Sequence, residues 1–120
     1  QVGEWFSFSE HFGGPGHYML KVRGDSMVRA GIFDGDWVVV RAADHAPTRT
    51  IVVATVDSET TIKLLERVGE TWMLFACNDD LPPIDLDPAR DNRVIGVVVG
   101  VVGLFRRRTL PLIRKPGKGR

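Results

Sequence analysis

Two residues in this chain could together carry out nucleophilic catalysis: a serine in a sharp turn and a lysine in a predicted strand. Ser26 lies in Gly24-Asp25-Ser26-Met27, between a predicted strand and a predicted short helical turn. Gly24 permits a sharp backbone turn, and a serine that opens a helical turn exposes its hydroxyl beside amide N–H groups that can stabilise an oxyanion. The alternative is that Ser26 only caps this turn, as serine usually does there.

Lys63 could supply the base that such a serine needs. It lies in the predicted strand 60–65, where side chains alternate, so Thr61 and Lys63 share one face while Ile62 and Leu64 share the other. A general base must be neutral, and holding a lysine of pKa about 10.4 neutral at pH 7 costs roughly 4–5 kcal/mol. Burial can lower a lysine pKa by up to about 5, which is enough. The alternative is a charged, solvent-facing lysine.

Other catalytic chemistries have little support in the residues. His11, His17 and His45 lack the spacing of a paired metal site or of a serine triad, so we expect neither a metal nor a cofactor. The G-x-S-x-G motif of a nucleophile elbow is missing as well. Among catalytic chemistries the residues alone therefore leave a serine–lysine pair as the candidate, beside the alternatives of a capping serine and a solvent-facing lysine.

The elements that must position this pair are predicted to be mostly strands. Runs of β-branched residues bounded by turn residues recur at short intervals, and helical periodicity is scarce. We therefore predict a mainly β, compact fold of several short antiparallel strands, with one short helical turn at residues 26–30. The expected strands are residues 5–8, 18–22, 37–41, 51–56, 60–65 and 71–76, followed by a loop at 78–83, a polar connection at 85–93 and one or two buried strands within 94–105.

Composition narrows the class of protein. The chain has 120 residues, which suits one domain, and its 43% hydrophobic and 26% charged residues are ordinary for a soluble globular protein. A net charge of +1 gives no overall field that would attract nucleic acid or acidic lipid. The single cysteine, Cys77, excludes an internal disulfide and fits the reducing cytoplasm. The apolar run 94–105 is well short of the ~20 residues that span a membrane, so no membrane partner is expected.

Positive charge gathers at the C-terminal end of the sequence. We predict a folded domain over residues 1–106 and a basic, disordered tail over 107–120. Single-stranded DNA binding would need aromatic residues along a basic groove, whereas Trp5, Trp37 and Trp72 fall on separate predicted strands. We expect this tail to be solvated. The basic residues within the last fifteen positions are Arg106, Arg107, Arg108, Arg114, Lys115, Lys118 and Arg120.

Two signatures in the chain resemble the LexA/UmuD family of self-cleaving serine–lysine peptidases. Residues 21–27 and 31–40 are similar to the family's Gly-x-Ser-Met nucleophile motif and the Gly-Ile-x-Asp-Gly-Asp turn that follows it. Residues 51–54 and 60–63 are similar to the hairpin that carries the family's catalytic lysine. The order and spacing of the motifs match, and the resemblance covers about residues 4–106.

Other positions both support the resemblance and depart from it. Asn78 in a proline-containing loop and the closing strand 94–98 resemble the family. The family usually has Gly-Asp or Gly-Gln where this chain has Arg49-Thr50, and Asp-Gly-Glu where it has 57–59, Asp-Ser-Glu. A serine is less suited than glycine to a turn that needs a positive φ. These departures affect local turn geometry rather than the two catalytic candidates.

The resemblance implies a mechanism and its residues. Ser26 would be the nucleophile and Lys63 the general base, with Gly24, Asp25 and Met27 supporting the turn and the oxyanion. The family cuts its own chain at an Ala-Gly or Cys-Gly bond a few dozen residues upstream, in response to a RecA–single-stranded DNA filament. Residues 1–25 contain no such pair, so the scissile bond would lie before Gln1.

The resemblance also implies partners and leaves the biological role open. A homodimer through the C-terminal strands is expected, with Val94, Ile95, Val97 and Val99 as candidate interface residues and burial inside the monomer as the alternative. The domain could belong to a repressor that binds DNA through a separate N-terminal domain, or to a UmuD-like accessory subunit of an error-prone DNA polymerase. A signal-peptidase-like processing protease is less favoured, because those enzymes have a membrane anchor and usually a proline soon after Ser-Met.

Overall fold

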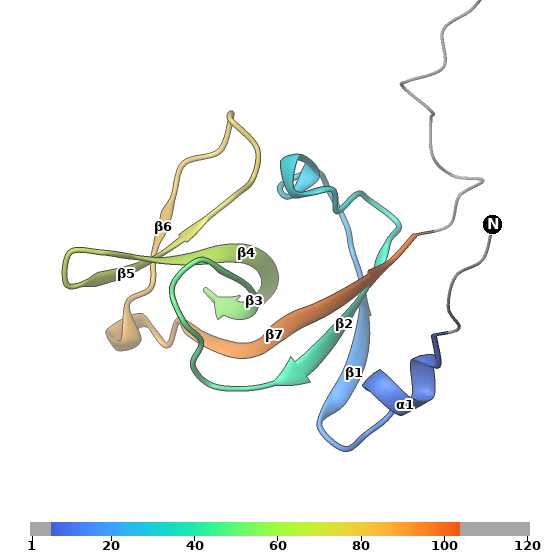
Figure 1. The fold of residues 1–120 in the computed structure, drawn as a ribbon. Coiled ribbons are helices and arrows are strands. Elements are labelled where there is room, and N and C mark those ends of the chain that lie inside the picture. The colour runs from blue at the N-terminus through green and yellow to red at the C-terminus, as the bar shows by residue number, and fades with distance from the viewer. Residues whose placement is uncertain (1–5, 104–120) are drawn as a thin grey trace, which may run out of the picture.

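One curved antiparallel sheet of seven strands forms the domain, in the order β1-β2-β7-β3-β4-β5-β6 (Figure 1). The computed structural model describes residues 6–103, so the predicted tail at 107–120 lies outside the described residues. The strands are β1 (His17–Lys21), β2 (Trp37–Ala42), β3 (Thr50–Val56), β4 (Glu59–Val68), β5 (Thr71–Phe75), β6 (Ile84–Asp85) and β7 (Arg93–Val102). The described residues also form three short helices: α1 (Phe8–Phe12), η1 (Val28–Ala30) and η2 (Pro88–Arg90). The prediction of a mainly β fold is confirmed.

The valine-rich run forms one long strand, β7, between β2 and β3. Its pairing with β2 shifts register between Val39 and Val40, a bulge that lets the long strand bend. Gly96 lies where a side chain would not fit, since a Cβ there would approach Val40 Cγ1 to 2.4 Å. The glycine within this run therefore permits a close approach of β2 and β7 rather than ending the strand.

Two hydrophobic clusters form the core on opposite faces of the sheet. Along β3 the side chains alternate, so Val53 packs in one cluster while Val52 and Ala54 pack in the other. The first cluster also contains Met27 and Ile32, from the segment that follows the nucleophile candidate. Core packing therefore fixes the position of this segment against the sheet.

Two predicted elements differ in the structure. Residues 5–8 were expected to form a strand. Residue 5 lies outside the described residues, and α1 begins at Phe8, because Ser7 caps it by accepting a hydrogen bond from the Glu10 N–H at 3.4 Å. The expected polar connection at 85–93 contains η2 and overlaps the last residue of β6 and the first residue of β7. The side chain of Asp87 caps η2, with a proline at its first turn.

The four candidate dimer residues of β7 pack inside the monomer. Val94 and Val97 are 4% and 8% exposed, and Ile95 and Val99 are partly buried against the core clusters. The exposed apolar side chains of β7 lie nearer its C-terminal end, at Val101 and Val102. Val94 and Val97 are therefore buried inside the monomer, whereas Ile95 and Val99 are buried only in part.

Candidate active site

The nucleophile candidate lies in a turn that is fixed at both ends. After β1, the Gly24 N–H donates to Asp34 Oδ1 at 2.7 Å, and the φ of Gly24 is +88°. A residue with a Cβ would be strained at that φ, so glycine permits the reversal just before Ser26. On the other side of Ser26, Met27 is 2% exposed and its carbonyl accepts hydrogen bonds from Ala30 and Ile32.

Ser26 does not cap the helical turn. The turn η1 begins at Val28, its N-cap is Met27, and no side chain forms a capping hydrogen bond there. Ser26 is half-buried, and its hydroxyl instead accepts a hydrogen bond from Lys63 Nζ. The capping alternative for this serine is therefore wrong.

The β3–β4 hairpin carries Lys63 to the nucleophile turn. Lys63 pairs across the hairpin with Val52, a fully buried residue of β3. Its Nζ lies 3.3 Å from Ser26 Oγ, 2.5 Å from Thr61 Oγ1 and 3.3 Å from the Ile62 carbonyl oxygen. The predicted sharing of one strand face by Thr61 and Lys63 explains why the threonine hydroxyl reaches the amine.

The surroundings of Lys63 favour its neutral form. The side chain is half-buried, and desolvation by burial lowers the pKa of Lys63 from its usual 10.5. Among residues 6–103, no carboxylate forms an ion pair with it that would restore the charge. The amine is therefore not freely exposed, and the direction of its pKa shift suits a group that accepts a proton from the adjacent hydroxyl.

Two polar residues at the site had no role assigned from the sequence. Thr61 contacts Lys63 Nζ, and its position two residues earlier on the same strand was the available signal. Asn78, in the loop after β5, donates through Nδ2 to the Asp25 carbonyl oxygen at 2.9 Å. The resemblance had placed Asn78 in the family pattern, but nothing in the sequence indicates a contact across more than fifty residues.

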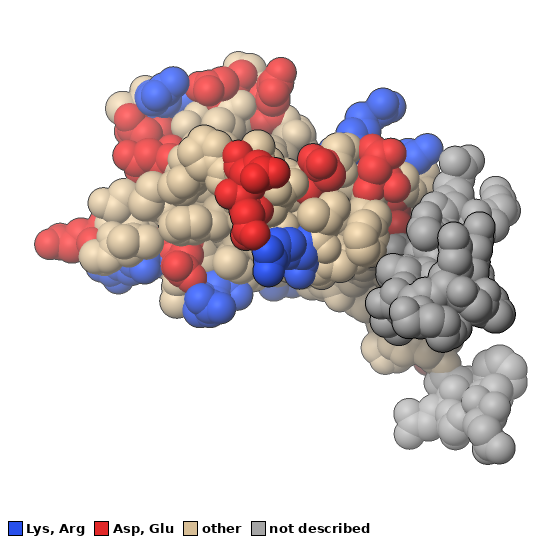
Figure 2. All heavy atoms as spheres, turned by 90° about the horizontal axis from the view of Figure 1, so that it is seen from above, with Lys and Arg blue, Asp and Glu red and all other residues tan. Residues whose placement is uncertain are grey.

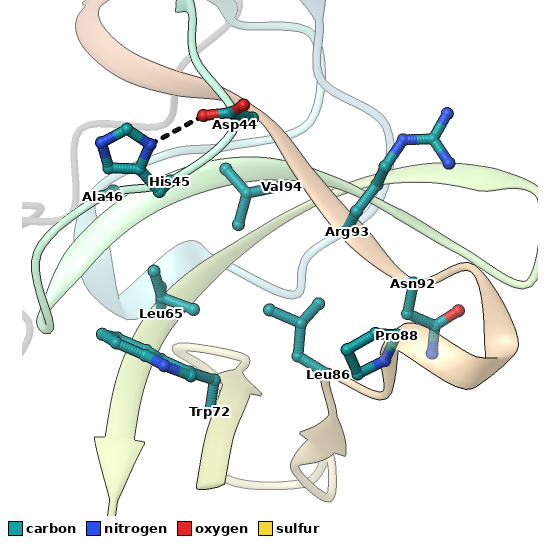
Figure 3. A pocket seen from close by; sticks show the side chains of 10 residues that line it. All are labelled: Asp44, His45, Ala46, Leu65, Trp72, Leu86, Pro88, Asn92, Arg93 and Val94. Atoms are coloured by element: carbon teal, nitrogen blue, oxygen red, sulfur yellow. Dashed lines mark hydrogen bonds and ion pairs between the residues drawn. The ribbon is translucent and has the colours of Figure 1, made fainter. Parts of the chain in front are cut away.

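A separate cavity of about 310 Å³ lies away from the serine and lysine, beside β4, β5 and β7 (Figure 3). At its rim His45 Nδ1 lies 2.7 Å from Asp44 Oδ1, and this hydrogen bond lowers the pKa of Asp44. An Asp–His pair could serve acyl transfer only beside a nucleophile, and no serine, threonine or cysteine lines the cavity. The lining residues are Asp44, His45, Ala46, Leu65, Trp72, Leu86, Pro88, Asn92, Arg93 and Val94.

Three other kinds of feature could mark a site in the described part of the chain: a basic surface area, a metal site and a membrane-spanning helix. On the face shown in Figure 2, acidic and basic side chains are interspersed, and no broad basic area covers it. Within residues 6–103, no group of three or more histidine, cysteine, aspartate or glutamate side chains could hold a metal ion. No helix in the same range is long and apolar enough to cross a membrane.

The fold and the sequence matches define the class of protein. A family model described as "Peptidase S24-like" matches residues 3–99, and the chain belongs to this peptidase family. The resemblance to the LexA/UmuD peptidases is thereby confirmed.

Relatives that are named LexA repressor give a more particular comparison. The chain is 47% identical over 85 residues to LexA repressor 2 of Pseudomonas putida, covering 71% of this chain and 42% of the relative. It is 44% identical over 98 residues to the LexA repressor of Zymomonas mobilis, covering 81% of this chain and 43% of the relative. The LexA repressor of Dechloromonas aromatica is 46% identical over 86 residues, which cover 71% of this chain and 43% of the relative. The chain thus matches less than half the length of these relatives.

Proposed function

We propose that this chain is the self-cleaving peptidase domain of a LexA-like transcriptional repressor, with Ser26 as nucleophile and Lys63 as general base. The observation that carries the proposal is the 3.3 Å contact between Lys63 Nζ and Ser26 Oγ, made by a half-buried lysine whose pKa is lowered by burial. The relatives named LexA repressor support the repressor role over that of a polymerase subunit.

The proposed reaction passes one proton between the two side chains. Neutral Lys63 Nζ takes the hydroxyl proton as Ser26 Oγ attacks the carbonyl carbon of the scissile bond, and a C–O bond forms. When the tetrahedral intermediate collapses, the C–N bond breaks and the Lys63 ammonium returns the proton to the leaving amine. In the second half of the reaction the neutral amine takes a proton from the water that attacks the ester carbon, and it returns this proton to Ser26 Oγ as the ester C–O bond breaks.

Thr61 fits this scheme as a partner of the amine. Its hydroxyl and the Ile62 carbonyl each accept a hydrogen bond from Lys63 Nζ, and the third polar contact of this nitrogen is with Ser26 Oγ. Holding a long side chain in one geometry reduces the entropy that the reaction must otherwise lose. This arrangement supports a base that is already aimed at the hydroxyl.

The substrate that we propose is a segment of the same protein upstream of Gln1, cut at an Ala-Gly or Cys-Gly bond. The matched relatives are more than twice as long as the shared region, which leaves room for such a segment and for an N-terminal DNA-binding domain. A RecA–single-stranded DNA filament would favour the conformation in which this segment occupies the site. Its effect would be a population shift between two loop states.

Homodimerisation is proposed through the C-terminal end of β7 rather than through the four buried or partly buried side chains. Val102 pairs with Trp37 of β2, and these apolar side chains, each 37% exposed, lie on one face together. Burial of such a patch between two copies is favourable. Sedimentation equilibrium should give a dimer for the wild type and a weakened one for Val102→Glu, and an unchanged dimer in this variant would contradict the interface.

Cleavage in trans tests the proposed function. The wild-type domain is mixed with a longer form of the same protein that carries the upstream segment and Ser26→Ala. We expect two fragments, whose new N-terminus, read by mass spectrometry, follows an Ala-Gly or Cys-Gly bond. Domains with Ser26→Ala or Lys63→Ala should give no fragments. Equal cleavage by either variant would overturn the serine–lysine assignment.

A further inference from the structure

The loop after β5 contacts the nucleophile turn through two hydrogen bonds to its backbone and through an ion pair between Asp79 and the Arg29 side chain. Asn78 Nδ2 donates to the Asp25 carbonyl oxygen at 2.9 Å, and the Cys77 carbonyl oxygen accepts from the Arg29 N–H at 2.8 Å. One contact lies just before Ser26 and the other three residues after it. Figure 1 shows the loop after β5 and the η1 turn at the same end of the molecule. The loop therefore spans the nucleophile rather than touching one side of it.

The amide of Asn78 is itself held in place. Its Oδ1 accepts a hydrogen bond from the Asp80 N–H at 3.1 Å, and its backbone carbonyl accepts one from the Leu81 N–H at 3.3 Å. With Oδ1 fixed by its own loop, the direction of Nδ2 is fixed as well, because the amide group is planar. Asn78 therefore presents a rigid donor to Asp25.

The contact with Asp25 has a geometric consequence for Ser26. The Asp25 carbonyl and the Ser26 N–H belong to one peptide group, and this peptide bond is trans. In a planar trans peptide the C=O and N–H point in opposite directions. A donor that fixes the Asp25 carbonyl on one side therefore fixes the Ser26 N–H on the other.

The Ser26 N–H is free to serve a substrate. Among residues 6–103, no carbonyl or side chain accepts a hydrogen bond from it. A backbone N–H beside an attacking serine is well suited to stabilise the oxyanion of a tetrahedral intermediate, and preorganised donors of this kind contribute strongly to rate. The Ser26 N–H and the Asp25 carbonyl that accepts from Asn78 thus belong to one oriented peptide group.

We infer that Asn78 is a positioning residue for the reaction: by holding the Asp25 carbonyl, it orients the Ser26 N–H as an oxyanion donor. This inference rests on the proposed function of Ser26 as nucleophile. Asn78 touches neither the substrate nor the reacting atoms, and it acts only through the peptide group. Its loss should slow the chemical step without weakening substrate binding or changing the protonation of Lys63.

The test is cleavage in trans by Asn78→Ala, with substrate concentration and pH varied. Since removing a whole oxyanion donor costs about 10²–10³ in kcat, misorienting one should lower kcat by roughly 10- to 100-fold. KM should stay within about threefold, and the apparent pKa of the pH–rate profile should match that of the wild type. The matched control is Asp79→Ala, which removes the contact of the neighbouring residue with Arg29 at a site 77% exposed. This control should cleave at the wild-type rate.

Several results would overturn the inference. They are an unchanged kcat in Asn78→Ala, an equal loss in Asp79→Ala, or a loss that appears in KM or in the apparent pKa. Asn78→Leu, which keeps the volume and lacks the donor, repeats the test if the alanine variant unfolds by circular dichroism. If both unfold, Asn78 acts through stability and the positioning role is wrong. An inactive wild type would instead refute the proposed function, so the two failures are distinguishable.

Discussion

The hairpin that carries Lys63 turns through two strained residues, and relieving one of them should stabilise the domain. Val56 pairs with Glu59, so Asp57 and Ser58 form a two-residue turn, and their φ values are +50° and +68°. Positive φ at both central residues is the pattern of a type I′ turn, which favours Asp-Gly. The replacement Ser58→Gly restores that sequence, and Ser58 forms no side-chain hydrogen bond with the described residues that would be lost.

The size of the effect follows from two opposing terms. A left-handed φ costs a residue with a Cβ about 1–2 kcal/mol, which glycine avoids. Glycine loses more backbone entropy on folding, about 0.5–1 kcal/mol. The net gain should be about 0.5–1 kcal/mol in the free energy of unfolding. Such a gain raises Tm by roughly 2–5 °C for a domain of this size.

Urea unfolding followed by circular dichroism measures the gain. The matched control is Glu70→Gly, at the second position of the other two-residue turn, between Val68 and Thr71, where φ is not positive. This control should be no more stable than the wild type, because glycine there relieves no strain. The reasoning would be refuted by a Ser58→Gly domain that is less stable than the wild type, or by an equal gain in the control.

Three further predictions concern the site and the core. Burial lowers the folded-state pKa of Lys63 below its usual 10.5, so between these two pKa values the unfolded chain binds more protons than the folded one. The stability of the wild type, compared with that of Lys63→Met, should therefore rise as the pH increases toward 10.5. A difference in urea midpoints between the two proteins that does not change with pH would contradict this. Thr61→Val should slow cleavage in trans by roughly 10- to 100-fold, because Lys63 becomes charged as it takes the Ser26 proton and a hydrogen bond to a charged group contributes about 1.5–3 kcal/mol. An unchanged rate would exclude the contact from catalysis. Gly96→Ala should lower the free energy of unfolding, measured in urea, by about 1–3 kcal/mol, because its Cβ would lie 2.4 Å from Val40 Cγ1. Gly100→Ala should be tolerated, because the nearest atoms to its Cβ would lie at 3.6 Å. Equal stabilities of the two variants would contradict the packing argument.

Strands were predictable where the pattern is local. The expected strands 37–41, 51–56 and 71–76 correspond to β2, β3 and β5 within one residue at each end, because β-branched runs bounded by turn residues define them. The helix α1 was missed because aromatic residues outweighed the capping signal of Ser7 and Glu10. The position of β7 between β2 and β3 depends on contacts between distant residues, which no local pattern contains.

The site was predictable only in part, and mainly through the resemblance. It singled out Ser26 and Lys63, which the structure brings within 3.3 Å, while their catalytic roles stay a proposal. The lowered pKa of Lys63 could not be predicted, because burial arises from the packing of the whole hairpin. The contact of Asn78 with Asp25 also requires the fold, since the two residues are distant along the chain.

The pH dependence of cleavage in trans tests the central claim most directly. Single-turnover rates are measured from pH 6 to 11 for the wild type and for Lys63→Ala, with the longer Ser26→Ala protein as substrate. If neutral Lys63 is the base, the wild-type rate rises with pH and then reaches a plateau, and the midpoint of the rise lies below pH 10.5. The variant shows no such rise. A wild-type rate that does not change with pH, or the same rise in Lys63→Ala, would contradict the serine–lysine mechanism.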